Sequence, residues 1–301
     1  MRRGEFGAAW GISDILLRRH LASPRAAIDV PRHQQVIWDG ASLQGQHVLV
    51  RCYHGLGDTI QFIRYLPLLK TIAAQVTVWA QPSLLTLLST MYGIDRLIPL
   101  HDGTPDCDYD AEIEVMELPY VFRTTIETIP ARVPYLHVDA SALDDCKMKV
   151  GLVWRGGDWD PRRDVPFDTL TQLTELQGIS FYALQQEPTA VEHHESFKTI
   201  LPRGADALTT ARVMRGLDLI ISIDSMPAHL AGALAVPTWT LLQENADWRW
   251  MSDRTDSPWY PTMRLFRQQE AGDWQPVVAQ VKTELREVLS SRRLHLSCLG
   301  D

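Results

Sequence analysis

The sequence predicts an α/β protein built from two doubly wound units, each with a parallel sheet. Short apolar runs alternate with helical patterns along most of the chain, which is typical of parallel strands covered by helices on both faces. A segment over 117–148 carries prolines and a polar end, and the alternation restarts after it. A chain of 301 residues is long enough for two domains that each bury a core.

The first unit is expected over 46–145 and begins with the apolar run "HVLVRC", a buried strand at 47–52. Further strands are predicted at 75–80, 96–100 and 111–115. Helices are predicted at 59–73, bent or broken at Pro67, and at 82–91. Residues 1–45 are expected to form an extension that packs on this domain. Within it, "FGAAWGISDILL" is typical of an amphipathic helix and not of a signal peptide.

The second unit is expected over 146–273. Strands are predicted at 149–154, 179–184, 217–223 and 237–242, and helices at 167–176, 206–216, 227–235 and about 274–292. The carboxyl ends of parallel strands meet at one edge of a sheet, and ligands of such folds bind there. The loops that follow the strands of both units are therefore expected to converge on a cleft between the two domains.

Composition narrows the classes of function. The formal net charge is −8 and the pI is about 5.7, which argues against general nucleic-acid binding. The four cysteines, Cys52, Cys107, Cys146 and Cys298, are far apart and have no metal-ligand spacing, so a reducing cytoplasm is the simpler expectation and no metal site is predicted. No apolar run approaches the roughly 20 residues of a membrane-spanning helix.

The turn "HGLGD" lies between the first strand and the first helix. A dinucleotide-binding fingerprint would need a third glycine where Ile60 stands, and the Gly-Lys-Ser/Thr of a P-loop is absent. Gly55 and Gly57 would still let a ligand approach the backbone. Asp58, with Gln61 three residues later, predicts a capping box, yet the same carboxylate would face the strand ends. Both a cap and a catalytic role therefore stay open for Asp58.

The turn "SIDSMPAHLAGA" at 222–233 favours phosphate or sugar binding. A buried strand ends at Asp224, and a helix begins near a proline suited to the first helical turn. The free N–H groups of Ser225, Met226 and Ala228 are expected to face an anion, and His229 lies in the same turn. A lone histidine in such a place is more often a structural hydrogen-bonding group than a catalyst.

Two further loops complete the expected cleft. In "RGGDWDPRRDVP" at 155–166, Arg162 or Arg163 could pair with a phosphate, although an exposed charged loop is the simpler interpretation for any single residue there. The loop "QENADWRWMSDRTDSPWYP" at 243–261 is long and rich in tryptophan. Loops of this length are usually functional or disordered, so this one forms either an acceptor wall or packing between the domains.

Together these motifs resemble glycosyltransferase family 9, the heptosyltransferase-like enzymes. The resemblance rests on "GLGDTIQFIRYLPLL", on "VGLVW" with the Arg-x-x-Pro that follows, on "DLIISIDSMPAHLAGALAVPTWTLL" and on "ADWRW…DSPWYPTMRLFRQ". It covers about residues 36–290 and is nearest to the branch that is often fused to tetratricopeptide repeats. Each motif alone is weak, whereas their combined order and spacing are specific.

The resemblance implies the GT-B fold, with a C-terminal helix over 274–301 that returns to the first, acceptor-side domain. It implies inverting, metal-independent transfer of a sugar from a nucleotide diphosphate donor, such as ADP-heptose, to a glycan or lipid-linked saccharide of the lipopolysaccharide type. A bacterial cytoplasmic enzyme that can touch the inner face of the membrane is expected, with no cofactor beyond the donor. The family's catalytic base falls on Asp58. Donor-binding positions fall on Gly55, Gly57, Arg163, Gln185, Asp224, Ser225, Met226 and His229, and the acceptor or cleft wall on His54, Trp248 and Arg249.

The sequence departs from the family pattern at several positions. Ser225 stands where threonine is usual, Met226 where glycine or serine is common, and Arg163 where many heptosyltransferases have lysine. Two alternatives therefore stay open. One is a UDP-sugar-dependent GT-B transferase or epimerase, and the other is a non-catalytic module that only binds a nucleotide sugar.

Overall fold

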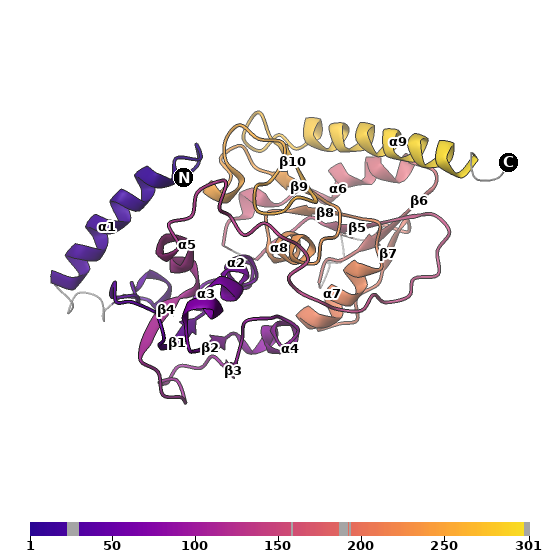
Figure 1. Ribbon diagram of the computed structural model, residues 1–301. Helices are drawn as coiled ribbons and strands as arrows, with labels where there is room; N and C mark the ends of the chain where they lie inside the picture. Colours follow the sequence, from indigo (N-terminus) through magenta and orange to yellow (C-terminus); the bar gives the residue numbers. More distant parts are fainter. Residues whose placement is uncertain (23–29, 158, 187–191, 193, 298–301) are drawn as a thin grey trace.

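A computed structural model shows two α/β domains, each built on a parallel sheet (Figure 1). It describes residues 1–22, 30–157, 159–186, 192 and 194–297. The first sheet has four strands in the order β3-β2-β1-β4, and the second has six in the order β10-β9-β8-β5-β6-β7. The described part of the chain contains no helix that is both long and apolar enough to cross a membrane.

The first sheet consists of β1 (His47–Arg51), β2 (Gln75–Ala80), β3 (Arg96–Pro99) and β4 (Ala111–Glu114). Its helices are α2 (Leu56–Phe62), α3 (Leu66–Ile72), α4 (Leu85–Leu88) and α5 (Leu118–Val121). Side chains alternate across β1: Val48 and Val50 join the main apolar core, whereas Leu49 packs with Trp79 and Ile98 on the other face. Both faces of this strand are therefore buried, as its continuous apolar run predicts.

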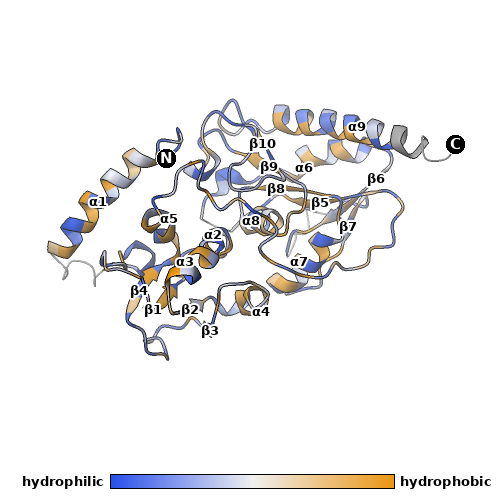
Figure 2. Ribbon diagram, viewed as in Figure 1, coloured by the Kyte–Doolittle hydropathy of each residue, from blue (hydrophilic) through white to orange (hydrophobic). Residues whose placement is uncertain are grey.

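The second sheet consists of β5 (Met148–Val153), β6 (Ile179–Ala183), β7 (Phe197–Thr199), β8 (Leu219–Ile223), β9 (Thr238–Leu242) and β10 (Met263–Arg267). Its helices are α6 (Phe167–Leu170), α7 (Ala207–Arg215), α8 (Met226–Ala233) and α9 (Gln275–Ser297). Every residue of β8 and β9 is buried. Figure 2 shows apolar residues along the strands of this sheet and on the sides of α6 and α9 that face it.

The C-terminal helix α9 packs on the second domain. Val278 and Leu285 are fully buried in the apolar cluster that also contains α6 and the second sheet. Lys282 donates to Glu175 at 2.6 Å, and Figure 1 shows the helix running away from the first domain. The expectation that this helix returns to the first domain is therefore wrong, because its apolar side faces the second sheet.

The N-terminal helix α1 (Phe6–Ala22) contacts both domains. Trp10 Nε1 donates to the carbonyl of Thr124 in the first domain at 2.7 Å. Phe6 packs edge-on against Trp248 and Trp259 of the second domain, with ring centroids 6.4 and 6.5 Å away. The N-terminal extension thus reaches beyond the first domain, on which it was expected to pack.

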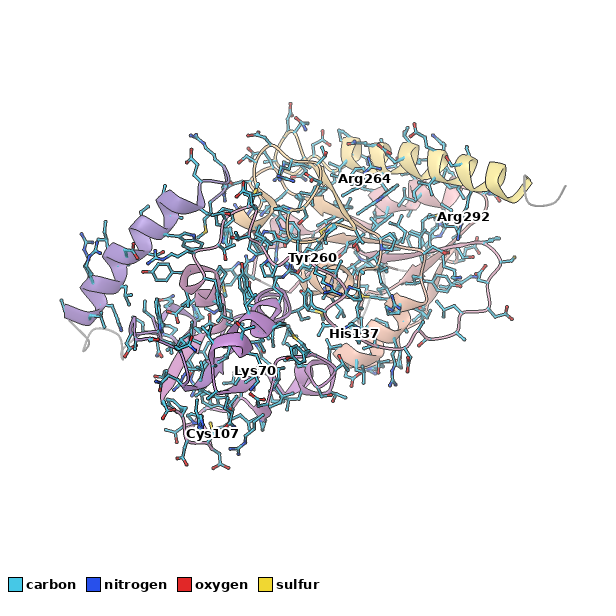
Figure 3. The ribbon with its side chains drawn as sticks, viewed as in Figure 1. Lys70, Cys107, His137, Tyr260, Arg264 and Arg292 are labelled. Atoms are coloured by element: carbon cyan, nitrogen blue, oxygen red, sulfur yellow. The ribbon has the colours of Figure 1, made fainter. Side chains whose placement is uncertain are left out.

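One continuous apolar cluster joins the two domains, and α2 packs directly against α8 within it. Tyr260 lies near the centre of the molecule, between the two sheets (Figure 3). Its ring lies 4.3 Å from the buried guanidinium of Arg64, which also donates to the hydroxyl of Tyr135 at 3.0 Å. Cation–π contacts and hydrogen bonds thus stabilise a buried charge at the domain interface.

Beside this contact, a cavity of about 410 Å³ opens between α4, α7 and the segment at 134–139. None of the predicted site residues lines it.

The packing at Gly232 yields a test of the fold. A Cβ on Gly232 of α8 would lie 2.3 Å from the Tyr260 ring, whereas one on Gly11 of α1 would meet nothing within 4 Å. We expect Gly232→Ala to lower the free energy of unfolding by about 1–3 kcal/mol through overpacking. The matched Gly11→Ala control should raise it by about 0.5–1 kcal/mol. Urea unfolding followed by circular dichroism measures both, and equal stabilities would contradict the packing.

Candidate functional site

Asp58 closes the turn between β1 and α2. The helix begins earlier than expected: Gly55 is the N-cap, and the Oδ2 atom of Asp58 accepts a hydrogen bond from Gly55 N–H at 3.0 Å. The predicted capping box between Asp58 and Gln61 is therefore wrong, because Asp58 occupies the third helical position. Gln61 is instead buried, and neither of its amide atoms has a hydrogen-bond partner in the described part of the chain.

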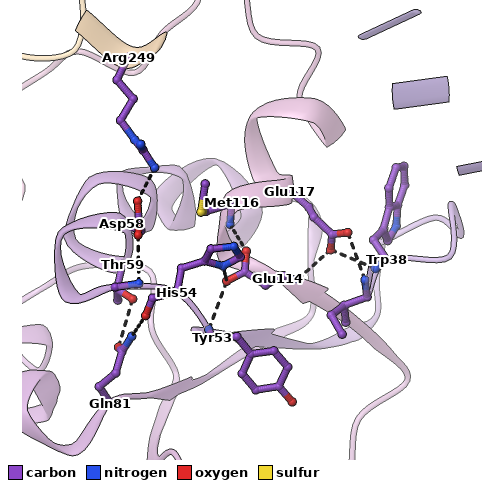
Figure 4. Close-up of polar contacts among 12 residues, drawn as sticks. Trp38, Tyr53, His54, Asp58, Thr59, Gln81, Glu114, Met116, Glu117 and Arg249 are labelled. Atoms are coloured by element: carbon purple, nitrogen blue, oxygen red, sulfur yellow. Dashed lines mark hydrogen bonds and ion pairs between the residues drawn. The ribbon is translucent and has the colours of Figure 1, made fainter. Parts of the chain in front are cut away.

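Arg249 of the second domain reaches across to Asp58 (Figure 4). Its Nη2 forms an ion pair with Asp58 Oδ1, and its Nη1 lies 2.8 Å from Asp247 Oδ1. The guanidinium also lies over the rings of Phe62 and Trp248, at 5.3 and 5.5 Å from their centroids. The Arg249 side chain is 10% exposed and that of Asp58 26%, so Asp58 is the more accessible partner.

His54 lies on the other side of Asp58, next to a buried acid (Figure 4). Its Nδ1 is 3.0 Å from Oε1 of Glu114, which is only 1% exposed and also accepts the backbone N–H of Tyr53 and of Met116. Burial opposes the charged imidazole, but the neighbouring carboxylates of Glu114 and Asp58 outweigh it and raise the pKa of His54. His54 therefore gains a proton more readily than a free histidine.

The start of α8 faces the start of α2. A Cβ on Gly57 would lie 2.9 Å from His229 Cδ2 and 3.4 Å from Met226 Cα, so the absence of a side chain at Gly57 allows this approach. The N–H of Ala228 donates to the Ser225 carbonyl at 3.0 Å, so the expectation that it faces an anion is wrong. Ser225 and Met226 are partly exposed and keep their place at the helix start.

Asp224 and His229 are buried behind this helix start. Burial raises the pKa of the Asp224 carboxyl, and His229 Nε2 lies 3.9 Å from its Oδ1. His229 Nδ1 is within 3.0 Å of the Tyr260 hydroxyl, and the ring stacks on Trp250 at 5.3 Å. Burial, followed by the charges of nearby arginines, lowers the pKa of His229 well below its usual value. A neutral, buried imidazole within hydrogen-bonding distance of Tyr260 matches the structural interpretation of His229.

Arg163 is anchored beside the same turn. Its Nη1 donates to the carbonyl oxygen of Asp224 at 2.8 Å, and its Nε donates to the carbonyl of Asp160 at 3.2 Å. Arg162 instead turns outward and pairs with the Asp160 carboxylate at 2.7 Å, with 74% of its side chain exposed. Of the two arginines that the sequence offered, Arg163 is thus the one next to the start of α8.

Gln185 occupies a neighbouring position at the end of β6. Its Oε1 accepts the backbone N–H of Arg155 at 3.0 Å. It also lines a cavity of about 380 Å³ at the carboxyl ends of β6 and β7, together with Gln186, Thr199, Leu201, Pro202, Arg203 and Gly204. This cavity lies in the second domain, on the side where its strands end.

The structure thus groups most predicted residues around the contact between α2 and α8. Trp248 stacks on Phe62 and packs edge-on against Trp259, so it contributes to packing between the domains, one of the two roles expected for its loop. Sequence reasoning missed Glu114, at the end of β4, and Asp247, within the 243–261 loop, because no local pattern shows that these acids contact His54 and Arg249. Among the described residues, no group of His, Cys, Asp and Glu side chains is placed to hold a metal ion.

The His54–Glu114 pair predicts a pH dependence. A pKa raised by folding contributes stability that is fully present below the unfolded value, about 6.5, and is lost as the pH rises through the folded value. The melting-temperature difference between the wild type and His54→Gln should therefore be largest near pH 5 and shrink toward pH 9. A thermal-shift series measures it, with exposed His137→Gln as the control. A difference that grows with pH would contradict the assignment.

No protein-family model matches the chain. A curated protein with a similar sequence is FlbA of Caulobacter vibrioides, with 26% identity over 88% of this chain. The chain spans about half of that relative's length, 51%. This similarity alone does not indicate an activity for the chain.

Solved structures with a similar fold are glycosyltransferases. A family 9 glycosyltransferase from Veillonella parvula matches 76% of this chain and 87% of its own length, with a TM-score of 0.58 and 14% identity. The E. coli heptosyltransferase WaaC, solved with ADP, matches 80% of this chain and 99% of its own, with a TM-score of 0.55 and 14% identity. The two-domain parallel-sheet architecture predicted from the sequence is thereby confirmed: this chain has the GT-B fold of the heptosyltransferases.

Proposed function

We propose that the protein is a metal-independent glycosyltransferase that uses a nucleotide diphosphate sugar. The observation that carries this proposal is the meeting of α2 and α8: Gly57 approaches Met226 at the start of α8, and the adjacent Asp58 pairs with Arg249 of the other domain. Arg163 and Arg249 add positive charge at the same place. Transfer of a sugar to a hydroxyl requires a base and a site for the diphosphate, and both would lie at the boundary between the two domains.

The donor would lie along the second domain. Its diphosphate would meet Arg163 and the start of α8 at Met226, because helix starts and arginine both favour phosphate. Its nucleoside would extend toward Gln185 and the cavity at the ends of β6 and β7. The proposed donor is ADP-heptose, by analogy with the neighbours solved with ADP and with ADP-D-β-D-heptose.

The proposed reaction proceeds with inversion. Asp58 accepts the proton of the acceptor hydroxyl while that oxygen attacks the anomeric carbon, and the bond from that carbon to the diphosphate breaks. Charge that grows on the leaving diphosphate is stabilised by Arg163 and by the dipole of α8. His54, beside Asp58, contributes to the acceptor side, where a glycan or lipid-linked saccharide at the inner face of a bacterial membrane would bind.

A non-catalytic nucleotide-sugar-binding module is the second candidate. It is favoured by one observation: both oxygens of Asp58 already have partners, Arg249 and the Gly55 N–H, so the carboxylate that would act as the base is already engaged. A UDP-sugar-dependent transferase or epimerase differs only in the donor, and binding measurements with several nucleotides separate these cases.

Asp58→Asn tests the catalytic role. Asparagine can still accept the Gly55 N–H, so the start of α2 should persist. We expect turnover of the donor sugar onto a saccharide acceptor to fall by about 10²–10⁴, the usual share of a general base, with the melting temperature nearly unchanged. A coupled assay of released nucleoside diphosphate measures this. Near-normal turnover in the variant would remove Asp58 from the role of base.

Arg163→Ala and Arg162→Ala form a matched pair for the diphosphate site. Arg163 lies against the start of α8, whereas Arg162 is exposed and tied to Asp160. We expect loss of Arg163 to weaken ADP binding by about tenfold, the factor that corresponds to 1.4 kcal/mol, and loss of Arg162 to leave it unchanged. Isothermal calorimetry compares the two. Equal effects would show that the arginines act only through overall charge.

A further inference from the structure

Arg249 is surrounded by carboxylates from three segments of the chain. Asp58 and Asp247 form ion pairs with it, and Asp224 acts on it through its charge. Burial disfavours the charged guanidinium, but these three acids outweigh the effect and raise the pKa of Arg249. It is therefore a permanent cation whose two ion-pair partners, Asp58 and Asp247, are partly exposed to solvent.

The hydrogen-bonding capacity of this cation is only partly used. Its Nε is buried and has no hydrogen-bond partner within the described chain. A guanidinium presents its donors as a planar fork that suits two oxygens of one phosphate better than the single oxygen Asp58 offers. The charges of Arg249 and Arg163 both act on Asp224, so both arginines border the start of α8.

We propose that Arg249 exchanges partners during the reaction: it pairs with Asp58 as described here, and it pairs with the diphosphate of a bound donor. This inference rests on the proposed function and adds a residue that couples donor binding to the base. While Arg249 holds Asp58 Oδ1, that oxygen is occupied by the guanidinium. When a diphosphate takes the guanidinium, Oδ1 becomes free for the acceptor hydroxyl.

The exchange fits the chemistry of the transfer. The acceptor O–H bond breaks and its proton moves to Asp58 Oδ1, while the acceptor oxygen bonds to the anomeric carbon. The bond between that carbon and the diphosphate breaks, and its electron pair stays on the diphosphate, where Arg249 and Arg163 meet the added charge. Because the base is released only by the donor, the donor is expected to bind before the acceptor.

If Asp58 and a diphosphate compete for Arg249, removing the negative charge of Asp58 should strengthen ADP binding. We expect Asp58→Asn to lower the Kd of ADP by about 2–5-fold, the factor for an ion pair worth 0.5–1 kcal/mol. Adenosine, which lacks phosphates, should bind the wild type and the variant equally. In an Arg249→Met background the gain from Asp58→Asn should vanish. Isothermal calorimetry measures all of these affinities on the full chain.

Two further variants complete the experiment: one is a control for charge, and the other is a second substitution of Arg249. Asp256→Asn removes one negative charge from an exposed pair with Arg254, away from the site, and should leave ADP affinity unchanged. Arg249→Lys keeps the charge without the fork; it replaces Arg249→Met if that variant does not fold, and it should also reduce the gain.

The outcomes separate this inference from the proposed function. If ADP binds but Asp58→Asn leaves its affinity unchanged or weaker, or if the gain persists without Arg249, the partner exchange is wrong and the proposed function stands. If the wild type binds none of ADP, UDP and GDP, the proposed function is wrong and the exchange with it.

Discussion

The approach of two helix starts, α2 and α8, is the constraint on which the candidate site depends. Gly57 lets α2 come within van der Waals distance of Met226 and His229, and Gly232 lets α8 lie against the Tyr260 ring. A side chain at either glycine would push the elements apart. Asp58 can meet Arg249 only because of this approach, since the two residues belong to different domains.

Positive charge is concentrated at the same interface. Arg64 is buried among tyrosine rings and carbonyl oxygens and Arg249 among acids, whereas Arg163 is half-buried against the Asp224 carbonyl. Buried cations are costly unless they are paired, and both Arg64 and Arg249 have partners. In the function proposed above, the charges of Arg163 and Arg249 would meet the leaving diphosphate. His229, kept neutral by its burial, contributes no competing charge and lies within hydrogen-bonding distance of the Tyr260 hydroxyl.

Local sequence patterns predicted the positions of most strands, but they did not predict contacts between residues far apart in the sequence. The strand expected at 75–80 is β2 with the same bounds, and the one expected at 47–52 differs from β1 by one residue, because continuous apolar runs are strong signals. The helix expected at 59–73 is divided near Pro67 into α2 and α3, and β7 and β10 were not predicted. The pair Asp58–Arg249 spans 191 positions, and no local pattern connects them. The direction of α9 was expected from the family resemblance alone, and it differs because the apolar side of this helix packs on the second sheet.

If this interface binds a nucleoside diphosphate, as we propose, a thermal-shift panel of ADP, UDP, GDP, CMP and NAD will reveal it. A ligand at about a hundred times its Kd adds roughly 2.7 kcal/mol, and a chain of this size gains about 2–4 °C for each kcal/mol. We expect a shift of several degrees with one diphosphate, ADP if the donor is ADP-heptose. No shift with any of the nucleotides, or a shift with NAD alone, would contradict it.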